Sequence, residues 1–126
     1  MSRLVDIQAV PIIDVWGTTV RARRVEGERL TFALVELAAN AEVPEHRHDN
    51  EQIGMVIQGQ VTFTIDEETR ALGPGGTWCI PPGAAHHVDV GPDGAVVIDV
   101  FAPGRSDWDG LPSSPPGPAA GWPADR

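Results

Sequence analysis

The stretch of sequence that decides the fold runs from residue 44 to residue 90 and reads PEHRHDNEQIGMVIQGQVTFTIDEETRALGPGGTWCIPPGAAHHVDV. It consists of short runs in which apolar and polar residues alternate, and Gly, Pro, Asn or Asp closes each run. No run keeps the i, i+3, i+4 spacing of an amphipathic helix for three turns. The stretch therefore predicts β-strands rather than helices.

The same pattern extends over the chain as far as residue 101. Short strands are expected at Leu4 to Val10, Val20 to Val25, Leu30 to Leu37, Glu45 to His48, Gln52 to Gln58, Val61 to Asp66, Thr77 to Ile80, His86 to Val90 and Ala95 to Phe101. Chain reversals are expected at Gly27-Glu28, Gln58-Gly59-Gln60, Gly73-Pro74-Gly75-Gly76, Pro81-Pro82-Gly83 and Gly91-Pro92-Asp93-Gly94. Many short antiparallel strands of this kind predict an all-β sandwich or barrel.

Length and charge limit the classes of function. A chain of 126 residues is long enough for one domain with a buried core. Its 18 acidic and 9 basic residues give a net charge of −9, so DNA, RNA or an anionic membrane surface would be repelled. No apolar run approaches a membrane span or a signal peptide, and the single cysteine, Cys79, excludes an internal disulfide. We expect a cytoplasmic protein without nucleic-acid or membrane partners.

Composition divides the chain into a barrel domain at residues 1–105 and a C-terminal arm at residues 106–126. Six of the 12 prolines lie in residues 102–126, which is typical of an extended or disordered arm. Trp108 and Trp122 are costly to leave in water, so parts of the arm are expected to dock on the barrel or on a partner subunit. The apolar surface of the N-terminal strands and the arm predicts a homodimer.

Three histidines have the arrangement of metal ligands. His46 and His48 are two residues apart on an expected strand and therefore share one face of a sheet. Two of four histidines can also take this spacing by chance. Gln52 can face the same way further along the chain, and His86 follows a Pro-x-Gly corner at the start of another strand. Together these residues raise the expectation of a metal site above chance spacing.

The two blocks resemble the two motifs of the cupin superfamily, G-x5-H-x-H-x3,4-E-x6-G and G-x5-P-x-G-x2-H-x3-N. Seven positions agree in identity and spacing, namely His46, His48, Gly59, Gly75, Pro81, Gly83 and His86. Three positions depart from the pattern: Asn40 and Val90 replace turn residues, and Gln52 replaces the usual glutamate. The resemblance implies a cupin barrel, that is, a double-stranded β-helix or jelly roll. It also implies that His46, His48, Gln52 and His86 bind one divalent transition metal, Ni, Zn, Fe or Mn.

Gln52 changes the charge of such a site. Three neutral imidazoles and a neutral amide leave the +2 charge of a metal uncompensated, whereas a glutamate would cancel half of it. The site should therefore favour an anionic oxygen ligand, which predicts a small anionic molecule as partner. Glu51 is the rival ligand, but alternation points it away. His87 alternates away from His86 and is expected at the surface or behind the site.

A second segment with chemical character lies near the end of the last strand. Asp99 and Phe101 alternate onto one face, and Arg105 follows the turn Pro103-Gly104. On its own, Asp99 is best explained by a structural ion pair, because a buried carboxylate needs a partner. The segment is similar to the D-x-F-x-P-x-R ending of KdgF-like cupins, which linearise unsaturated uronate sugars. That resemblance implies that Asp99, Phe101 and Arg105 take part in activity.

The sequence thus favours a metal-dependent enzyme that isomerises an unsaturated uronate or a similar carboxylated substrate. Three alternatives stay open: a cupin dioxygenase, a polyketide-type cyclase whose cavity would have aromatic walls, and a non-catalytic module that binds a metal or a ligand.

Overall fold

The computed structural model describes residues 3–119, and this range is built almost entirely of strands and connecting turns. The strands are β1 (Ile12–Trp16), β2 (Val20–Glu26), β3 (Thr31–Leu37), β4 (Glu42–His46), β5 (Glu51–Ile65), β6 (Glu68–Leu72), β7 (Thr77–Ile80), β8 (His86–Ala102) and β9 (Ser113–Ser114). Two short 3-10 helices, η1 (Ile7–Ala9) and η2 (Ser106–Gly110), complete the described elements. The all-β class predicted from the sequence is confirmed.

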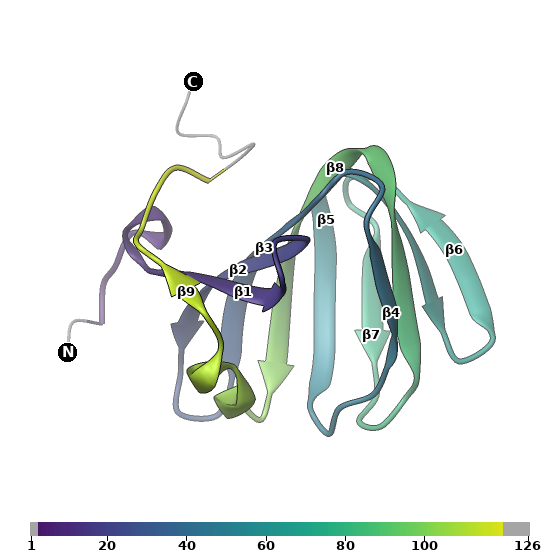
Figure 1. Ribbon diagram of the computed structural model, residues 1–126. Coiled ribbons are helices and arrows are strands. Elements are labelled where there is room, and N and C mark those ends of the chain that lie inside the picture. Colours follow the sequence, from purple (N-terminus) through teal and green to yellow (C-terminus); the bar gives the residue numbers. More distant parts are fainter. Residues whose placement is uncertain (1–2, 120–126) are drawn as a thin grey trace.

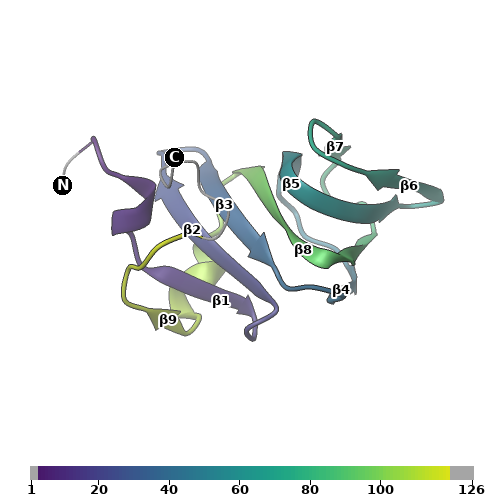
Figure 2. The same ribbon diagram turned by 90° about the horizontal axis from the view of Figure 1, so that it is seen from above.

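All the strands join one antiparallel sheet that folds over on itself. Its order is β6-β5-β8-β3-β2-β1-β9, with β4 paired to β8 and β7 paired to β5. The long strands β5 and β8 make the fold possible, because β8 pairs with both β3 and β4 while β5 pairs with both β6 and β7 (Figure 1). Seen from above, β5, β6 and β7 lie to one side of β8, and β3, β2 and β1 extend from its other side (Figure 2).

β5 and β8 are continuous where the sequence predicts two strands each. The expected reversals at Gln58–Gln60 and Gly91–Gly94 are wrong, because both segments are irregularities within paired strands. Gly59 has a φ of 84°, and a Cβ there would lie 2.1 Å from the carbonyl oxygen of Gly94. The two segments therefore lie against each other, and each bends its strand instead of ending it.

The N-terminal segment also differs from the prediction. The strand expected at Leu4 to Val10 is replaced by η1, because the side chain of Asp6 accepts a hydrogen bond from the Gln8 backbone N–H at 2.8 Å and caps a helical turn. Strand β1, which pairs with β2 and β9, starts later, at Ile12. β1 lies outside the predicted ranges, and β6 and β9 were not predicted either, since most of their residues are polar or exposed.

The core fills the space inside the folded sheet. Its buried members are Ile13, Val20, Ala22, Ala33, Val35, Val43, Val56, Val61, Phe63, Trp78, Ile80, Val88, Val90, Ala95, Val97, Phe101 and Trp108. Trp108 lies in η2, so this part of the segment after residue 105 packs against the inside of the sheet. Trp122 lies outside the described residues.

Residues 113–119 lie along the other side of the N-terminal strands. Ser113 and Ser114 pair with β1, and the buried guanidinium of Arg23 donates to the carbonyl oxygens of Gly117 and Pro118. Ala119 packs into a small second cluster with Leu34 and Val96. Among residues 3–119, no helix is long and apolar enough to span a membrane.

Candidate functional site

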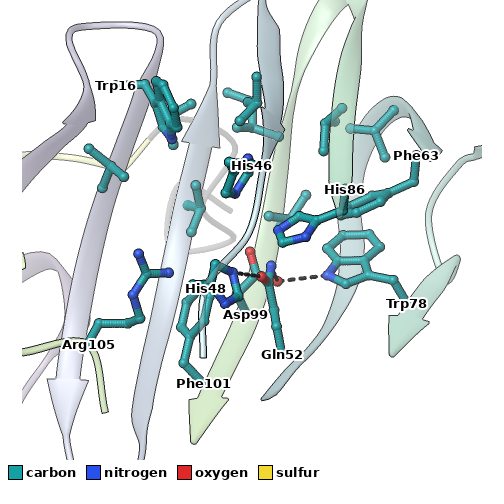
Figure 3. A pocket seen from close by; sticks show the side chains of 18 of the residues that line it. Trp16, His46, His48, Gln52, Phe63, Trp78, His86, Asp99, Phe101 and Arg105 are labelled. Atoms are coloured by element: carbon teal, nitrogen blue, oxygen red, sulfur yellow. Dashed lines mark hydrogen bonds between the residues drawn. The ribbon is translucent and has the colours of Figure 1, made fainter. Parts of the chain in front are cut away.

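The three predicted histidines meet at one mouth of the folded sheet. His46 ends β4 and His86 begins β8, and the two are direct cross-strand partners. His48 follows in the turn before β5, and one nitrogen of each ring lies within 4.8 Å of the others. The rings point toward one another in the pocket (Figure 3).

Backbone contacts define which nitrogen of each ring can bind a metal. Each Nδ1 lies within hydrogen-bond distance of a carbonyl oxygen: 2.8 Å from Pro44 for His46, 3.0 Å from Asn50 for His48 and 2.9 Å from Ala84 for His86. A carbonyl only accepts, so each Nδ1 carries the hydrogen and each Nε2 keeps its lone pair. His86 Nε2 is buried with no hydrogen-bond partner. This donor set is what a divalent cation requires.

Gln52 adds an oxygen to the same centre. Its Nε2 donates to Asp99 Oδ1 at 2.8 Å, which turns its Oε1 toward His48 Nε2 at 3.0 Å. Both of these atoms are acceptors in the tautomer just derived, so a cation beside them would relieve their repulsion. The residues present therefore fit a metal ion, and His46, His48, Gln52 and His86 could hold one.

The neighbouring candidates lie outside the centre. Glu51 is exposed, as alternation predicts. His87 is part-buried, and its Nε2 lies 3.8 Å from Asp89 Oδ2 on the side of β8 that faces away from the pocket.

Burial sets the protonation of the site. It lowers the pKa of His86 to about 4, and burial followed by the Arg105 guanidinium lowers the pKa of His48. Both imidazoles are therefore neutral at pH 7 and available as ligands. Burial also raises the pKa of the Asp99 carboxyl to about 6, although hydrogen bonds from Gln52 and Trp78 oppose the rise. Asp99 is mostly ionised at neutral pH but is poised to take up a proton.

Asp99, Phe101 and Arg105 line the same pocket as the histidines. Asp99 and Phe101 share the inner face of β8 and are both buried. The Arg105 guanidinium lies 4.7 Å from the Phe101 ring centroid and 4.8 Å from that of Trp108. The pocket therefore places a cation, a carboxylate and a candidate metal centre around one space.

Two side chains hold the Arg105 segment in place. Asn50 Nδ2 donates to the carbonyl oxygens of Pro103 and Gly104, at 2.6 and 3.3 Å. These hydrogen bonds connect the turn that carries His48 to the turn before Arg105. Asp107 accepts from Arg105 Nε at 3.0 Å and from its Nη2 at 2.9 Å. The hydrogen bond with Arg105 lowers the pKa of Asp107, which is otherwise largely exposed.

Sequence reasoning missed several residues of this pocket. Trp16, Phe63, Trp78 and Trp108 line it beside Phe101, so part of its wall is aromatic and the rest is largely aliphatic. Alternation along the strand Thr77–Ile80 could have placed Trp78 on the inner face. No local signal marks the pairing of Asp107 with Arg105.

The fold and the site together define a class of protein. The family model described as a cupin domain matches residues 33–101, more than half of the chain. The chain therefore belongs to the cupin family, and the resemblance read from its two motifs is confirmed.

Within this family, the chain is a small cupin that resembles KdgF. It is 32% identical over 80 residues to the pectin degradation protein KdgF of Dickeya dadantii, an alignment that covers 63% of this chain and 73% of the relative. The structure of KdgF from a Halomonas species superposes with a TM-score of 0.76 at 26% identity, over 85% of this chain and 98% of that one. An RmlC-like cupin from Shewanella frigidimarina shares the fold, with a TM-score of 0.77 at 23% identity over 85% and 96% of the two chains.

Proposed function

We propose that this protein is a metal-dependent enzyme that opens the ring of a 4,5-unsaturated hexuronate and yields the linear 4-deoxy-5-keto isomer. The observation that carries the proposal is the presence, around one pocket, of a three-histidine centre, the buried carboxylate of Asp99 and the guanidinium of Arg105. Similarity to a pectin degradation protein supports the same substrate class.

The metal site consists of His46, His48, Gln52 and His86, and it takes one divalent transition metal such as Ni, Zn, Fe or Mn. When bound, the metal supplies Lewis acidity that polarises a substrate oxygen. Because all four protein ligands are neutral, the centre attracts a negatively charged oxygen more strongly than it would with a glutamate ligand.

Asp99 carries the proton. The substrate is a cyclic hemiacetal whose ring oxygen is bonded to carbon 5 of a carbon 4–carbon 5 double bond. The ionised carboxylate removes the proton of the anomeric hydroxyl, the bond between the anomeric carbon and the ring oxygen breaks, and an aldehyde and an enolate form. Asp99 then returns a proton to carbon 4, which leaves a ketone at carbon 5. The product is an isomer of the substrate, so no co-reactant is consumed.

Arg105 binds the carboxylate of the substrate with its fork of donors, and Phe101 packs against the guanidinium at 4.7 Å. In the structure that fork is paired with Asp107. A substrate carboxylate must therefore displace Asp107 or share the guanidinium with it.

The experiment that tests the proposal follows the loss of the conjugated double-bond absorbance of an unsaturated uronate monomer. Metal-loaded wild-type protein should accelerate the loss, and Asp99→Asn should lower the rate by about 10²-fold or more. Arg105→Ala should chiefly raise KM, because the clamp binds ground state and transition state alike. Asp89→Asn, an exposed carboxylate on the outer side of the same strand, is the matched control and should keep full activity. Equal rates with and without wild-type protein would reject the proposal.

The aromatic part of the pocket wall supports a second candidate, cyclisation of a polyketide-type or other flat aromatic precursor. Quenching of tryptophan fluorescence by a planar polyphenol at micromolar concentration, together with no loss of the uronate absorbance, would favour it. The same titration without any turnover would favour a non-catalytic binding module, and oxygen uptake by iron-loaded protein would favour a dioxygenase.

We also propose that the protein is a homodimer. The outer face of the sheet carries a contiguous apolar surface, because Phe32 and Ile53 both pair with Val100 while Met55 pairs with Ile98. Phe32, Ile53 and Met55 are 36%, 52% and 40% exposed. A second copy of the chain, packed through the same face about a two-fold axis, would cover this surface.

A further inference from the structure

The side chains of Trp78 and Asp99 form a hydrogen bond, although a third strand lies between the strands that carry them. Trp78 lies on β7 and Asp99 on β8, and both strands pair with β5 on its opposite edges. Gly54 is the β5 residue in register with both. The indole N–H of Trp78 nevertheless donates to Asp99 Oδ1 at 2.8 Å, and both side chains are buried (Figure 3).

Gly54 makes this contact possible. A Cβ at residue 54 would lie 2.3 Å from Asp99 Oδ1 and 2.4 Å from Trp78 Nε1, closer than any packed pair of atoms allows. Glycine is required at residue 54 because the hydrogen bond between Trp78 and Asp99 passes directly over the backbone of β5 and leaves no space for a side chain. Any side chain at residue 54 would push the indole and the carboxylate apart.

The contact restricts how Asp99 can face the pocket. Oδ1 accepts from both Trp78 Nε1 and Gln52 Nε2, each at 2.8 Å, and two donors from different strands define the plane of the carboxylate. Trp78 is itself held by Phe63, with ring centroids 4.6 Å apart and a stacking angle of 27°. The donor is therefore a rigid group, and Oδ2 is left as the oxygen that exchanges a proton with the substrate.

We propose that Trp78 is a positioning residue that acts through Asp99. We also propose that Gly54, because it lacks a side chain, leaves the gap that their hydrogen bond requires. The kinetic consequence rests on the proposed function, in which Asp99 carries the proton. The geometric part does not, since it concerns only which donor orients the Asp99 carboxylate.

The kinetic test uses Trp78→Phe, which keeps an aromatic ring against Phe63 and removes the indole N–H together with part of the ring system. In zinc-loaded protein this variant should lower kcat for the unsaturated uronate by about 10- to 100-fold, the usual effect of removing an orienting hydrogen bond, with little change in KM. In an Asp99→Asn background the same change should cost nothing further. Equal losses in both backgrounds, or an unchanged kcat, would overturn the proposal.

A pair of glycine variants tests the gap. Gly54→Ala should reproduce the loss of kcat seen with Trp78→Phe. Gly73→Ala is the matched control, because a Cβ there meets nothing within 4 Å, and it should keep wild-type rates. Wild-type kcat in Gly54→Ala would overturn the role given to Gly54.

A spectroscopic test separates this inference from the proposed function. In the zinc-loaded protein, the indole N–H resonance missing from Trp78→Phe is assigned to Trp78. Asp99→Asn should shift that resonance more than the other indole resonances, and it should speed its exchange with solvent deuterium. If wild-type protein leaves the uronate unchanged but this coupling is seen, the proposed function fails and the positioning stands. If Asp99→Asn leaves the Trp78 resonance unmoved, the positioning is overturned whatever the activity.

Discussion

Replacing Asp99 with asparagine should stabilise the metal-free protein while it removes activity. Burial raises the pKa of Asp99 from 3.8 to about 6, so folding at neutral pH carries an ionised carboxylate into an unfavourable place. About two pKa units at about 1.4 kcal/mol each make this cost about 3 kcal/mol. Hydrogen bonds from Gln52 and Trp78 are already included in this net cost, and asparagine keeps an oxygen acceptor for both donors. Asp99→Asn should therefore gain about 3 kcal/mol of unfolding free energy at pH 7.

The gain has a defined pH dependence. A carboxyl whose folded-state pKa is raised contributes most to stability below its unfolded pKa, and that contribution is lost as pH rises through the folded value. The two proteins should thus differ little near pH 4 and increasingly up to about pH 6, with no further change above it. Urea unfolding of both metal-free proteins across this range measures the difference, with the exposed Asp89→Asn as control. A wild type that is the more stable protein at pH 7, or a difference independent of pH, would refute the reasoning.

Three further predictions follow from the pocket and the outer face. Asp107→Asn should free the fork of Arg105 and lower KM for an acidic substrate several-fold in initial-rate assays; an unchanged KM would show that Asp107 does not compete. Burial lowers the pKa of His86 to about 4 and also lowers that of His48, so bound metal should persist at about pH 6 and be released toward pH 4, as measured by equilibrium dialysis. A His48→Ala/His86→Ala double variant that kept its metal would contradict the ligand assignment. Met55→Glu should convert a dimer into a monomer by light scattering, and a wild-type monomer at micromolar concentration would exclude the dimer.

Much of the fold could be predicted because its strands alternate cleanly. The strand Thr77–Ile80 was predicted with the bounds it has, since Gly and Pro flank a short run in which inward and outward residues alternate. The prediction of an N-terminal strand was wrong because the capping side chain of Asp6 stabilises a helical turn locally. Alternation of apolar and polar residues does not detect such a cap.

In a sequence, the residues at a β-bulge and those at a tight turn look alike. Gly59 and Gly94 both take positive φ, as turn glycines do. Only their proximity in two paired strands, where Gly59 is in register with Ala95, shows that the chain bends there instead of reversing. That information depends on strand register, which one sequence does not contain.

Part of the candidate site could also be predicted from the sequence. Strand spacing predicted that His46 and His48 would point the same way, and the two do meet, although β4 ends at His46 and His48 lies in the turn that follows. Family motifs added Gln52 and His86. The contact between Trp78 and Asp99 joins residues on three strands through Gly54, so it depends on two registers at once. No pattern within a single strand indicates it.

The measurement that tests the central claim most directly is an NMR time course of an unsaturated uronate monomer with protein in three states: as purified, stripped by a chelator, and reloaded with one divalent metal. We predict that the purified and reloaded protein convert the monomer to its linear keto isomer, seen as loss of the vinyl proton and growth of a methylene pair at carbon 4. With the stripped protein, the monomer should be converted only at its uncatalysed rate. The same rate in all three states and in buffer alone would contradict the account.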